Sequence, residues 1–286
     1  MRAMRPALIA LLCGATCIAL SPIFVRVADV GPTASAFWRV ALSAPLLWPL
    51  AALAPRMAAA GPDLRLLLAA GIAFAGDLGF WHWSIRYTSV ANSTLLANLA
   101  SLFVTLAVWL FWRQRPSGAF LLGLAAALAG VFMLVHTSLA FSPTALLGDA
   151  LGVVTAMFYA GYILAVKHLR DSGAATLHVM AATTTITALT LLPLALLSGE
   201  TLVPRSASGW LTLAGLAWVS HCAGQGLIAY SLAHLPAAFS SVSLLFQPVM
   251  AALFAWLLLG EALSPLQIAG GGVVLAGISL ARRGSS

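Results

Sequence analysis

The feature of this sequence that most limits its fold is a series of apolar segments separated only by short breaks. An α-helix needs about 20 mostly apolar residues to cross the hydrocarbon of a bilayer. Charges, prolines and glycines divide the chain into ten such segments: 6–25, 33–54, 66–85, 90–112, 118–136, 148–166, 174–198, 210–233, 238–259 and 266–281. None shows the alternation of a barrel strand. The sequence therefore predicts an all-α, polytopic membrane protein with ten transmembrane helices.

The composition supports this class. The chain is 62% hydrophobic and 7% charged, with a mean hydropathy of +1.01, whereas a soluble domain carries about 25% charged residues. Its net charge of +7 does not indicate nucleic acid, because the basic residues are scattered between apolar runs and not gathered on one wet face. We expect a lipid bilayer around the chain and no nucleic-acid partner.

The distribution of basic residues predicts the orientation. With the N-terminus inside, ten Lys and Arg residues fall in cytoplasmic stretches and three in outer loops. Cytoplasmic loops of membrane proteins carry an excess of Lys and Arg, so both termini are predicted to be cytoplasmic. Arg39 lies about two turns into the second segment and is interpreted as a side chain that extends to the membrane surface, with binding of a carboxylate as the alternative. Candidate hinges within segments are Pro22, Pro45, Pro193 and Pro248.

The two halves of the chain resemble each other. A shift of 147 residues places Trp109 on Trp256, Ser117 on Ser264, Gly123 on Gly270 and Gly130 on Gly277. Near the start of each half a shift of 141 places Arg26 on Lys167, and the longer loop around Glu200 absorbs the difference. We predict two five-helix repeats, 1–143 and 144–286. Because five is odd, the second repeat is inverted, an arrangement that puts a transporter's substrate site near mid-membrane.

One turn differs between the repeats in an informative way. Gly260-Glu261-Ala262 in the second repeat corresponds to Arg113-Gln114-Arg115 in the first. Inversion places the basic version on the cytoplasmic side, as the positive-inside rule requires. We expect Glu261 to accept hydrogen bonds from the free N–H groups that begin the last helix, where negative charge is favourable.

Two stretches carry a family resemblance. "FWRVALSAPLL" (37–47) and "LLLGEALSPLQIAGGGVVLAG" (257–277), together with the five-plus-five arrangement, resemble the EamA branch of the drug/metabolite transporter superfamily. The resemblance implies a multi-pass carrier of the inner (plasma) membrane that exports metabolites or amino acids. The nearest type is a bacterial exporter of aromatic and other amino acids.

Ionisable groups within membrane segments usually face a cavity or a partner. Asp77 lies near the middle of the third segment, with Trp81, His82 and Trp83 close by. His221 lies at similar depth in the eighth segment, with Gln225 one turn on. We expect Asp77 to meet a substrate ammonium group, and Asp77 and His221 are the candidate sites of proton coupling.

Polar stripes mark three further segments. The fourth carries Thr94, Asn98, Ser101 and Thr105, the sixth Thr155, Tyr159 and Tyr162, and the ninth Ser240, Ser243 and Gln247. Such stripes line a cavity or join helices by hydrogen bonds. We predict a substrate site formed by Asp77, Trp81, His82, Trp83, Asn98, Ser101, Tyr159, Tyr162, His221, Gln225, Ser243 and Gln247.

The leading hypothesis is a secondary transporter that exports amino acids or related metabolites by alternating access. Other hypotheses are a carrier of another metabolite or drug class, a channel, or an intramembrane enzyme. No phosphate-binding Gly-x4-Gly-Lys-Ser/Thr motif, Gly-x-Ser-x-Gly motif or His-Glu-x2-His motif occurs in the sequence. We therefore predict no catalysis, no cofactor and no bound metal. Glycine stripes such as those at Gly148 and Gly270 are expected to pack helices within a monomer, with a homodimer seam as the alternative.

Overall fold

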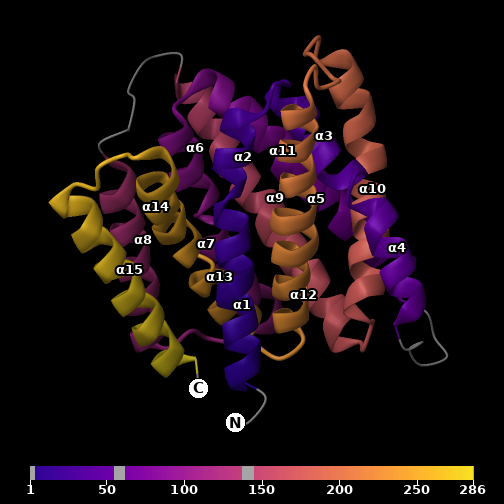
Figure 1. The fold of residues 1–286 in the computed structure, drawn as a ribbon. Helices are drawn as coiled ribbons and strands as arrows, with labels where there is room; N and C mark the ends of the chain where they lie inside the picture. Colours follow the sequence, from indigo (N-terminus) through magenta and orange to yellow (C-terminus); the bar gives the residue numbers. More distant parts are fainter. Residues whose placement is uncertain (1–3, 55–61, 137–144, 286) are drawn as a thin grey trace.

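The fold is a bundle of helices that run between two ends of the molecule (Figure 1). The computed structural model describes residues 4–54, 62–136 and 145–285. Its elements are α1 (Met4–Ala19), α2 (Ser21–Val27), α3 (Pro32–Ala41), α4 (Ala44–Leu53), α5 (Leu64–Tyr87), α6 (Val90–Ala97), α7 (Ala100–Trp112), α8 (Gly118–Val135), α9 (Ala145–Asp171), α10 (Thr176–Leu197), α11 (Ala207–Gly215), the π-helix η2 (Leu216–Gln225), α12 (Gly226–Leu232), α13 (Ala237–Ser243), α14 (Phe246–Leu259) and α15 (Pro265–Gly284). We call the end where α1 begins and α15 ends the terminal end, and the other the opposite end (Figure 1).

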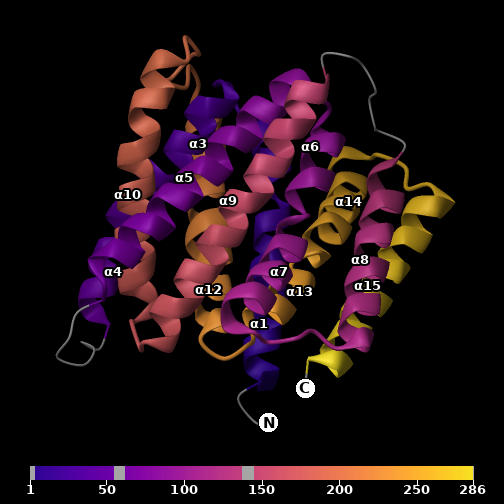
Figure 2. The ribbon, with the colours of Figure 1, turned by 180° about the vertical axis from the view of Figure 1, so that it is seen from behind.

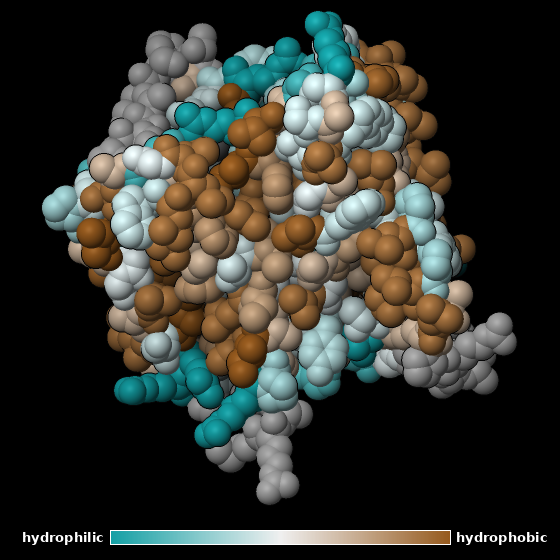
Figure 3. All heavy atoms as spheres, in the orientation of Figure 1, coloured by the Kyte–Doolittle hydropathy of each residue, from teal (hydrophilic) through white to brown (hydrophobic). Residues whose placement is uncertain are grey.

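The described helices confirm an all-helical, multi-pass membrane protein. Nine helical segments within the described ranges are long and apolar enough to cross a bilayer. The predicted segment 210–233 is helical along its length as the consecutive elements α11, η2 and α12. On the face shown in Figure 3, hydrophobic residues cover the middle of the molecule and hydrophilic residues gather toward its two ends.

Four of the predicted segments are not continuous helices. The breaks lie at Leu20, at Leu42–Ser43, at Asn98–Leu99 and at Leu244–Leu245. Three of them lie beside Pro22, Pro45 and Pro248, because proline lacks an N–H donor and its ring crowds the preceding turn. Pro193 lies inside α10 without a break.

The break between α6 and α7 has a different cause. The Asn98 side chain donates to the Thr94 carbonyl at 2.8 Å, and the Ser101 hydroxyl donates to the Asn98 carbonyl at 3.0 Å. Such local side-chain bonds compete with the helical backbone bonds. The shift of 147 places Asn98 on Leu245, so the fourth and ninth segments are interrupted at equivalent positions.

Helices α8 and α15 form a closely packed pair along one side of the bundle (Figures 1 and 2). A Cβ added to Gly123 would lie 2.6 Å from the Gly277 carbonyl oxygen, and one added to Gly130 would lie 2.7 Å from that of Gly270. Only glycine permits such an approach of two backbones. These glycines therefore pack helices within one chain.

The turns before α8 and α15 share one backbone design. Arg113 ends α7 with φ 55°, and Gly260 ends α14 with φ 70°. Ser117 and Ser264 then cap the next helices by accepting from backbone N–H groups three residues on. The expected role of Glu261 as a cap is wrong, because Ser264 fills it. Glu261 instead pairs with Arg26, Nη1 to Oε1, at 2.7 Å.

At the opposite end, loops from the two halves cap each other's helices. Glu200 Oε2 accepts from the backbone N–H of Thr33 at 2.8 Å, at the start of α3, and Glu200 also pairs with Arg86. Asp29 Oδ2 accepts from the Ser206 hydroxyl at 2.8 Å and from the Ser206 N–H at 3.1 Å, at the start of α11. Hydrogen bonds from the Ser206 hydroxyl, and then from the Arg205 and Ser206 N–H groups, hold the pKa of Asp29 below its ordinary value.

Candidate functional site

A cavity of about 150 Å³ lies between segments of both halves of the chain. Six of the twelve predicted site residues line it: Asp77, Trp81, Asn98, Tyr159, Gln225 and Gln247. They come from α5, the α6–α7 break, α9, η2 and α14. The broken fourth and ninth segments thus contribute to the cavity, as discontinuous helices do at the binding sites of many transporters.

Arg39 faces the same cavity, although the sequence placed it outside the predicted site and gave carboxylate binding only as its alternative role. Its side chain is buried, with 7% of the residue exposed, and its guanidinium carbon lies 5.9 Å from the centre of the Phe74 ring. Arg39 therefore does not extend to the membrane surface. It packs inward because α3 lies against α5 and α10. A cation and a carboxylate at similar depth in neighbouring segments were the signal that could have found it.

The cavity wall holds polar groups without partners. The Arg39 Nε, the Gln225 Oε1 and the Gln247 Nε2 are buried and have no hydrogen-bond partner among the described residues. Unpaired buried polar groups are costly, so their gathering around a cavity favours a polar ligand. Asp77 adds a carboxylate within Coulombic range of Arg39.

Aromatic rings form one side of the site. Tyr159, which lines the cavity, stacks on Tyr162 with 6.1 Å between ring centres, and Tyr162 packs on Phe74 at 4.6 Å. Phe74 in turn lies 5.4 Å from the His221 ring. This layer supplies apolar and stacking surface beside the charged groups.

The other six predicted residues lie outside the cavity wall. Tyr162 is behind Tyr159, and His221 is buried with its Nε2 2.7 Å from the Thr184 hydroxyl. His82 is buried, with its Nδ1 2.5 Å from the Leu78 carbonyl. Ser101 and Ser243 are buried and donate to backbone carbonyls of their own segments, and Trp83 is 44% exposed on the outer face of α5. Side chains two positions apart on a helix are separated by about 200° around its axis, so Trp81 and Trp83 point to different sides of α5.

The cavity continues toward the opposite end. A second cavity, of about 440 Å³, is lined there by Ile23, Val25, Arg26, Ile85, Ala255, Leu259 and Glu261 among others. It shares Ala19, Pro22, Trp81 and Ala251 with the central cavity. We call this route the open passage. Its walls are apolar except at the mouth, where Arg26 meets Glu261.

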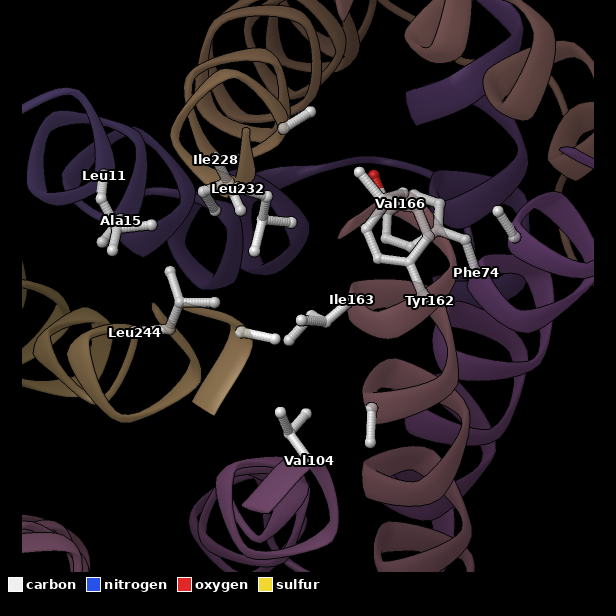
Figure 4. Packing of buried hydrophobic residues seen from close by; sticks show 14 of the residues in the cluster. Leu11, Ala15, Phe74, Val104, Tyr162, Ile163, Val166, Ile228, Leu232 and Leu244 are labelled. Carbon is white, nitrogen blue, oxygen red and sulfur yellow. The ribbon is translucent and has the colours of Figure 1, made fainter. Parts of the chain in front are cut away.

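Apolar packing closes the cavity toward the terminal end. We call the residues that fill this region the plug; they are Val104, Ile163, Val166, Ile228, Leu232 and Leu244. Figure 4 shows them converging from α7, α9, α12 and the α13–α14 break. Each has at most 5% of its surface exposed. On all four segments the plug lies between residues of the central cavity and residues of a third cavity at the terminal end.

The EamA-like transporter family model matches the chain at residues 5–136 and again at 146–283. The chain belongs to this family. The two matched segments are offset by 141 residues at their starts (146 − 5) and by 147 at their ends (283 − 136). This EamA-like protein is thus a multi-pass membrane transporter, and family membership points away from an enzyme.

Two individual comparisons agree with the family. An uncharacterized transporter of Archaeoglobus fulgidus is 27% identical over 274 residues, which cover 90% of this chain and 91% of that protein. A crystal structure with 19% sequence identity superposes with a TM-score of 0.81 over 100% of this chain and 99% of the other. At that identity the structural likeness shows the fold alone.

Proposed function

We propose that this EamA-like protein is a secondary transporter that exports amino acids or related small metabolites across the inner membrane by alternating access. Ten spans form two inverted repeats, 1–143 and 144–286, with both termini in the cytoplasm. The terminal end is then cytoplasmic, and the central cavity faces the outside in this structure.

The main support for this proposal is the different packing of corresponding residues at the two ends of the molecule. The shift of 147 relates four plug residues to positions of the other half: Val104 to Ala251, Ile228 to Trp81, Leu232 to Ile85 and Leu244 to Ala97. The shift of 141 relates the other two, Ile163 to Pro22 and Val166 to Val25. All six of these counterparts line the central cavity or the open passage. Equivalent positions are therefore packed together at one end and parted at the other. Exchanging the two arrangements between the repeats would close the outer route and open the cytoplasmic one, which is alternating access.

The charges of the cavity favour a zwitterionic cargo. Arg39 offers donors to a carboxylate, and Asp77 accepts from an ammonium group. The two charges are on different helices, α3 and α5, and face one small cavity. A free α-amino acid carries both groups on one carbon atom, and with an uncharged side chain it brings no net charge into the membrane. Tyr159 and Trp81 offer surface for an aromatic or aliphatic side chain.

The plug also favours a carrier over a channel, because a channel needs one continuous pore. Energy would come from the substrate gradient or from proton exchange. Asp77 in the cavity and His221 behind the aromatic layer are the candidate proton sites. A pH gradient should drive flux if protons are exchanged and should leave it unchanged in pure uniport.

The proposal is tested by reconstitution into liposomes. We expect saturable, exchange-stimulated flux of labelled amino acids, and Asp77→Asn should raise KM by about tenfold or more because it removes a buried charged partner of the ligand. Trp81→Ala should weaken transport, whereas the matched variant Trp83→Ala should leave it near normal, because Trp83 faces outward. Absence of protein-dependent flux for every amino acid and metabolite of the panel would overturn the proposal.

A further inference from the structure

A cavity opens at each end of the molecule, and we call its outer part the mouth. The residues that line the two mouths correspond to one another under the shifts of 147 and 141. The terminal-end cavity, of about 440 Å³, is lined by Val108, Trp112, Gln114, Leu164 and Lys167 among others. The shifts of 147 and 141 place these residues on Ala255, Leu259, Glu261, Ile23 and Arg26, which line the open passage at the opposite end. We call the terminal-end cavity the cytoplasmic vestibule, in keeping with the proposed orientation.

The two mouths differ at one carboxylate. At the outer mouth the Arg26 guanidinium pairs with the Glu261 carboxylate of the other repeat at 2.7 Å. At the cytoplasmic mouth the residue equivalent to Glu261 is the neutral Gln114. Lys167, the counterpart of Arg26, pairs with Asp171 of its own helix α9.

We propose that the cytoplasmic vestibule is a second binding site, which takes a zwitterionic amino acid before it reaches the central cavity. This inference rests on the proposed function. The Lys167 ammonium binds the ligand carboxylate, which takes the place that the Glu261 carboxylate has beside Arg26 at the outer mouth. Asp171 accepts a hydrogen bond from the ligand ammonium group. The outer pair thus shows, within the same fold, a carboxylate bound to the equivalent basic residue.

The environment of Lys167 suits this role. Its side chain is 22% exposed, so it is partly withdrawn from water, while the Asp171 side chain is 51% exposed and accessible. A lysine ammonium group has three donors, so Lys167 can keep Asp171 and add a ligand carboxylate. Trp112 and Leu164 provide apolar surface for the ligand side chain, and His168 and His234 complete the polar wall.

The vestibule is separate from the central cavity. The plug lies between them, and the two cavities have no lining residue in common. A ligand bound in the vestibule therefore lies on the cytoplasmic side of the plug and is separated from the central cavity. Changes at Lys167 should affect transport that starts from the cytoplasmic face and spare transport that starts from the outer face.

The first test compares the two faces in membrane vesicles of opposite orientation. Lys167→Gln and Gln114→Glu should each raise KM for alanine or phenylalanine presented at the cytoplasmic face by about fivefold or more, an effect of about 1 kcal/mol. The first removes the cation, and the second supplies a competing carboxylate. KM from the outer face should stay within about twofold of the unmodified chain, since about 0.4 kcal/mol corresponds to such a factor, and Lys167→Arg should restore the cytoplasmic KM. The matched variant Glu261→Gln at the outer mouth should leave the cytoplasmic KM unchanged.

Normal flux with unchanged cytoplasmic KM in both variants would overturn the second site and leave the proposed function standing. Absence of any protein-dependent flux with the unmodified chain would overturn the proposed function.

A second test does not depend on transport. In Gln114→Cys, we compare the reaction rates of an anionic thiosulfonate reagent and its cationic analogue. The ratio of the anionic rate to the cationic rate should fall several-fold when Lys167→Gln is added, because Lys167 attracts the anion. Millimolar amino acid should slow the reaction of Gln114→Cys. The unmodified chain, which keeps Cys13, Cys17 and Cys222, gives the background rate. An unchanged ratio of the two rates in Lys167→Gln, or no protection by amino acid, would overturn the second site.

Discussion

The two ends of this protein are held together by different forces. The terminal end is closed by the plug, whose side chains are apolar and buried. The opposite end is open along the passage, and its loops are joined by the carboxylates of Asp29, Glu200 and Glu261. Burial of apolar surface does not depend on salt or on carboxylate ionisation, whereas exposed ion pairs and charged caps do. The closed terminal end and the open opposite end are therefore held by different chemistry, although the shifts of 141 and 147 relate the plug to the walls of the open passage and central cavity.

The largest effect should come from shortening the plug. Leu244→Ala removes buried side-chain atoms, which in cores costs about 2–5 kcal/mol. The closed arrangement of the terminal end should lose that stability, so a neighbouring Ser243→Cys should react faster with a membrane-impermeant thiol reagent added on the side of the terminal end. Leu275→Ala is the matched control, because Leu275 is exposed on α15. Equal labelling in both variants would show that Leu244 does not hold this end closed.

The next effect concerns the polar end. Glu200→Ala removes the carboxylate that caps α3 and pairs with Arg86. Loss of a helix cap costs about 0.5–2 kcal/mol, so the midpoint of thermal unfolding in detergent should fall. Arg86→Ala should cost less, about 0–1 kcal/mol, because it removes only a partly exposed ion pair. If the two variants lose equal stability, the ion pair and not the cap joins the loops.

A third effect compares the equivalent turns after α7 and α14. Gly260 has φ 70°, so Gly260→Ala should destabilise the fold by about 1 kcal/mol. Arg113 adopts φ 55° without being glycine, and Arg113→Gly should stabilise it by up to about 1 kcal/mol for the same reason. Thermal unfolding of both variants measures the difference. Shifts of the same sign would contradict a shared turn design.

The smallest effect is the pH dependence of the Asp29 cap. The pKa of Asp29 is lowered in the folded protein, so its ionised form stabilises the fold above the unfolded-state pKa of about 3.9. This contribution is lost as the pH falls below that value and through the lowered folded pKa. Asp29→Asn should lower the thermal midpoint at pH 7 and lower it less at pH 3, where part of the contribution is already lost. An equal difference at both pH values would show that the charge of Asp29 is not what matters.

Much of the fold could be predicted from the sequence, because the bilayer limits it so strongly. Apolar length identified the helical segments, and prolines marked three of the four breaks. Asp77 was found because a carboxylate in hydrocarbon needs a cavity or a partner. Half of the predicted site residues line the cavity, since polar stripes show which helix face is buried without showing whether it meets a cavity or another helix.

The helical segments, the predicted correspondence of positions across the shifts of 141 and 147, and the place of Asp77 in mid-segment all follow from the order of residues along the chain. What the corresponding positions do depends on how the helices pack. Arg39 turns inward to the cavity, Glu261 pairs with Arg26 and not with a helix start, and Val104 packs into the plug while Ala251 lines the passage. Periodicity and composition specify what each helix face can bury, but they do not specify the partner, because distant helices supply it when they pack.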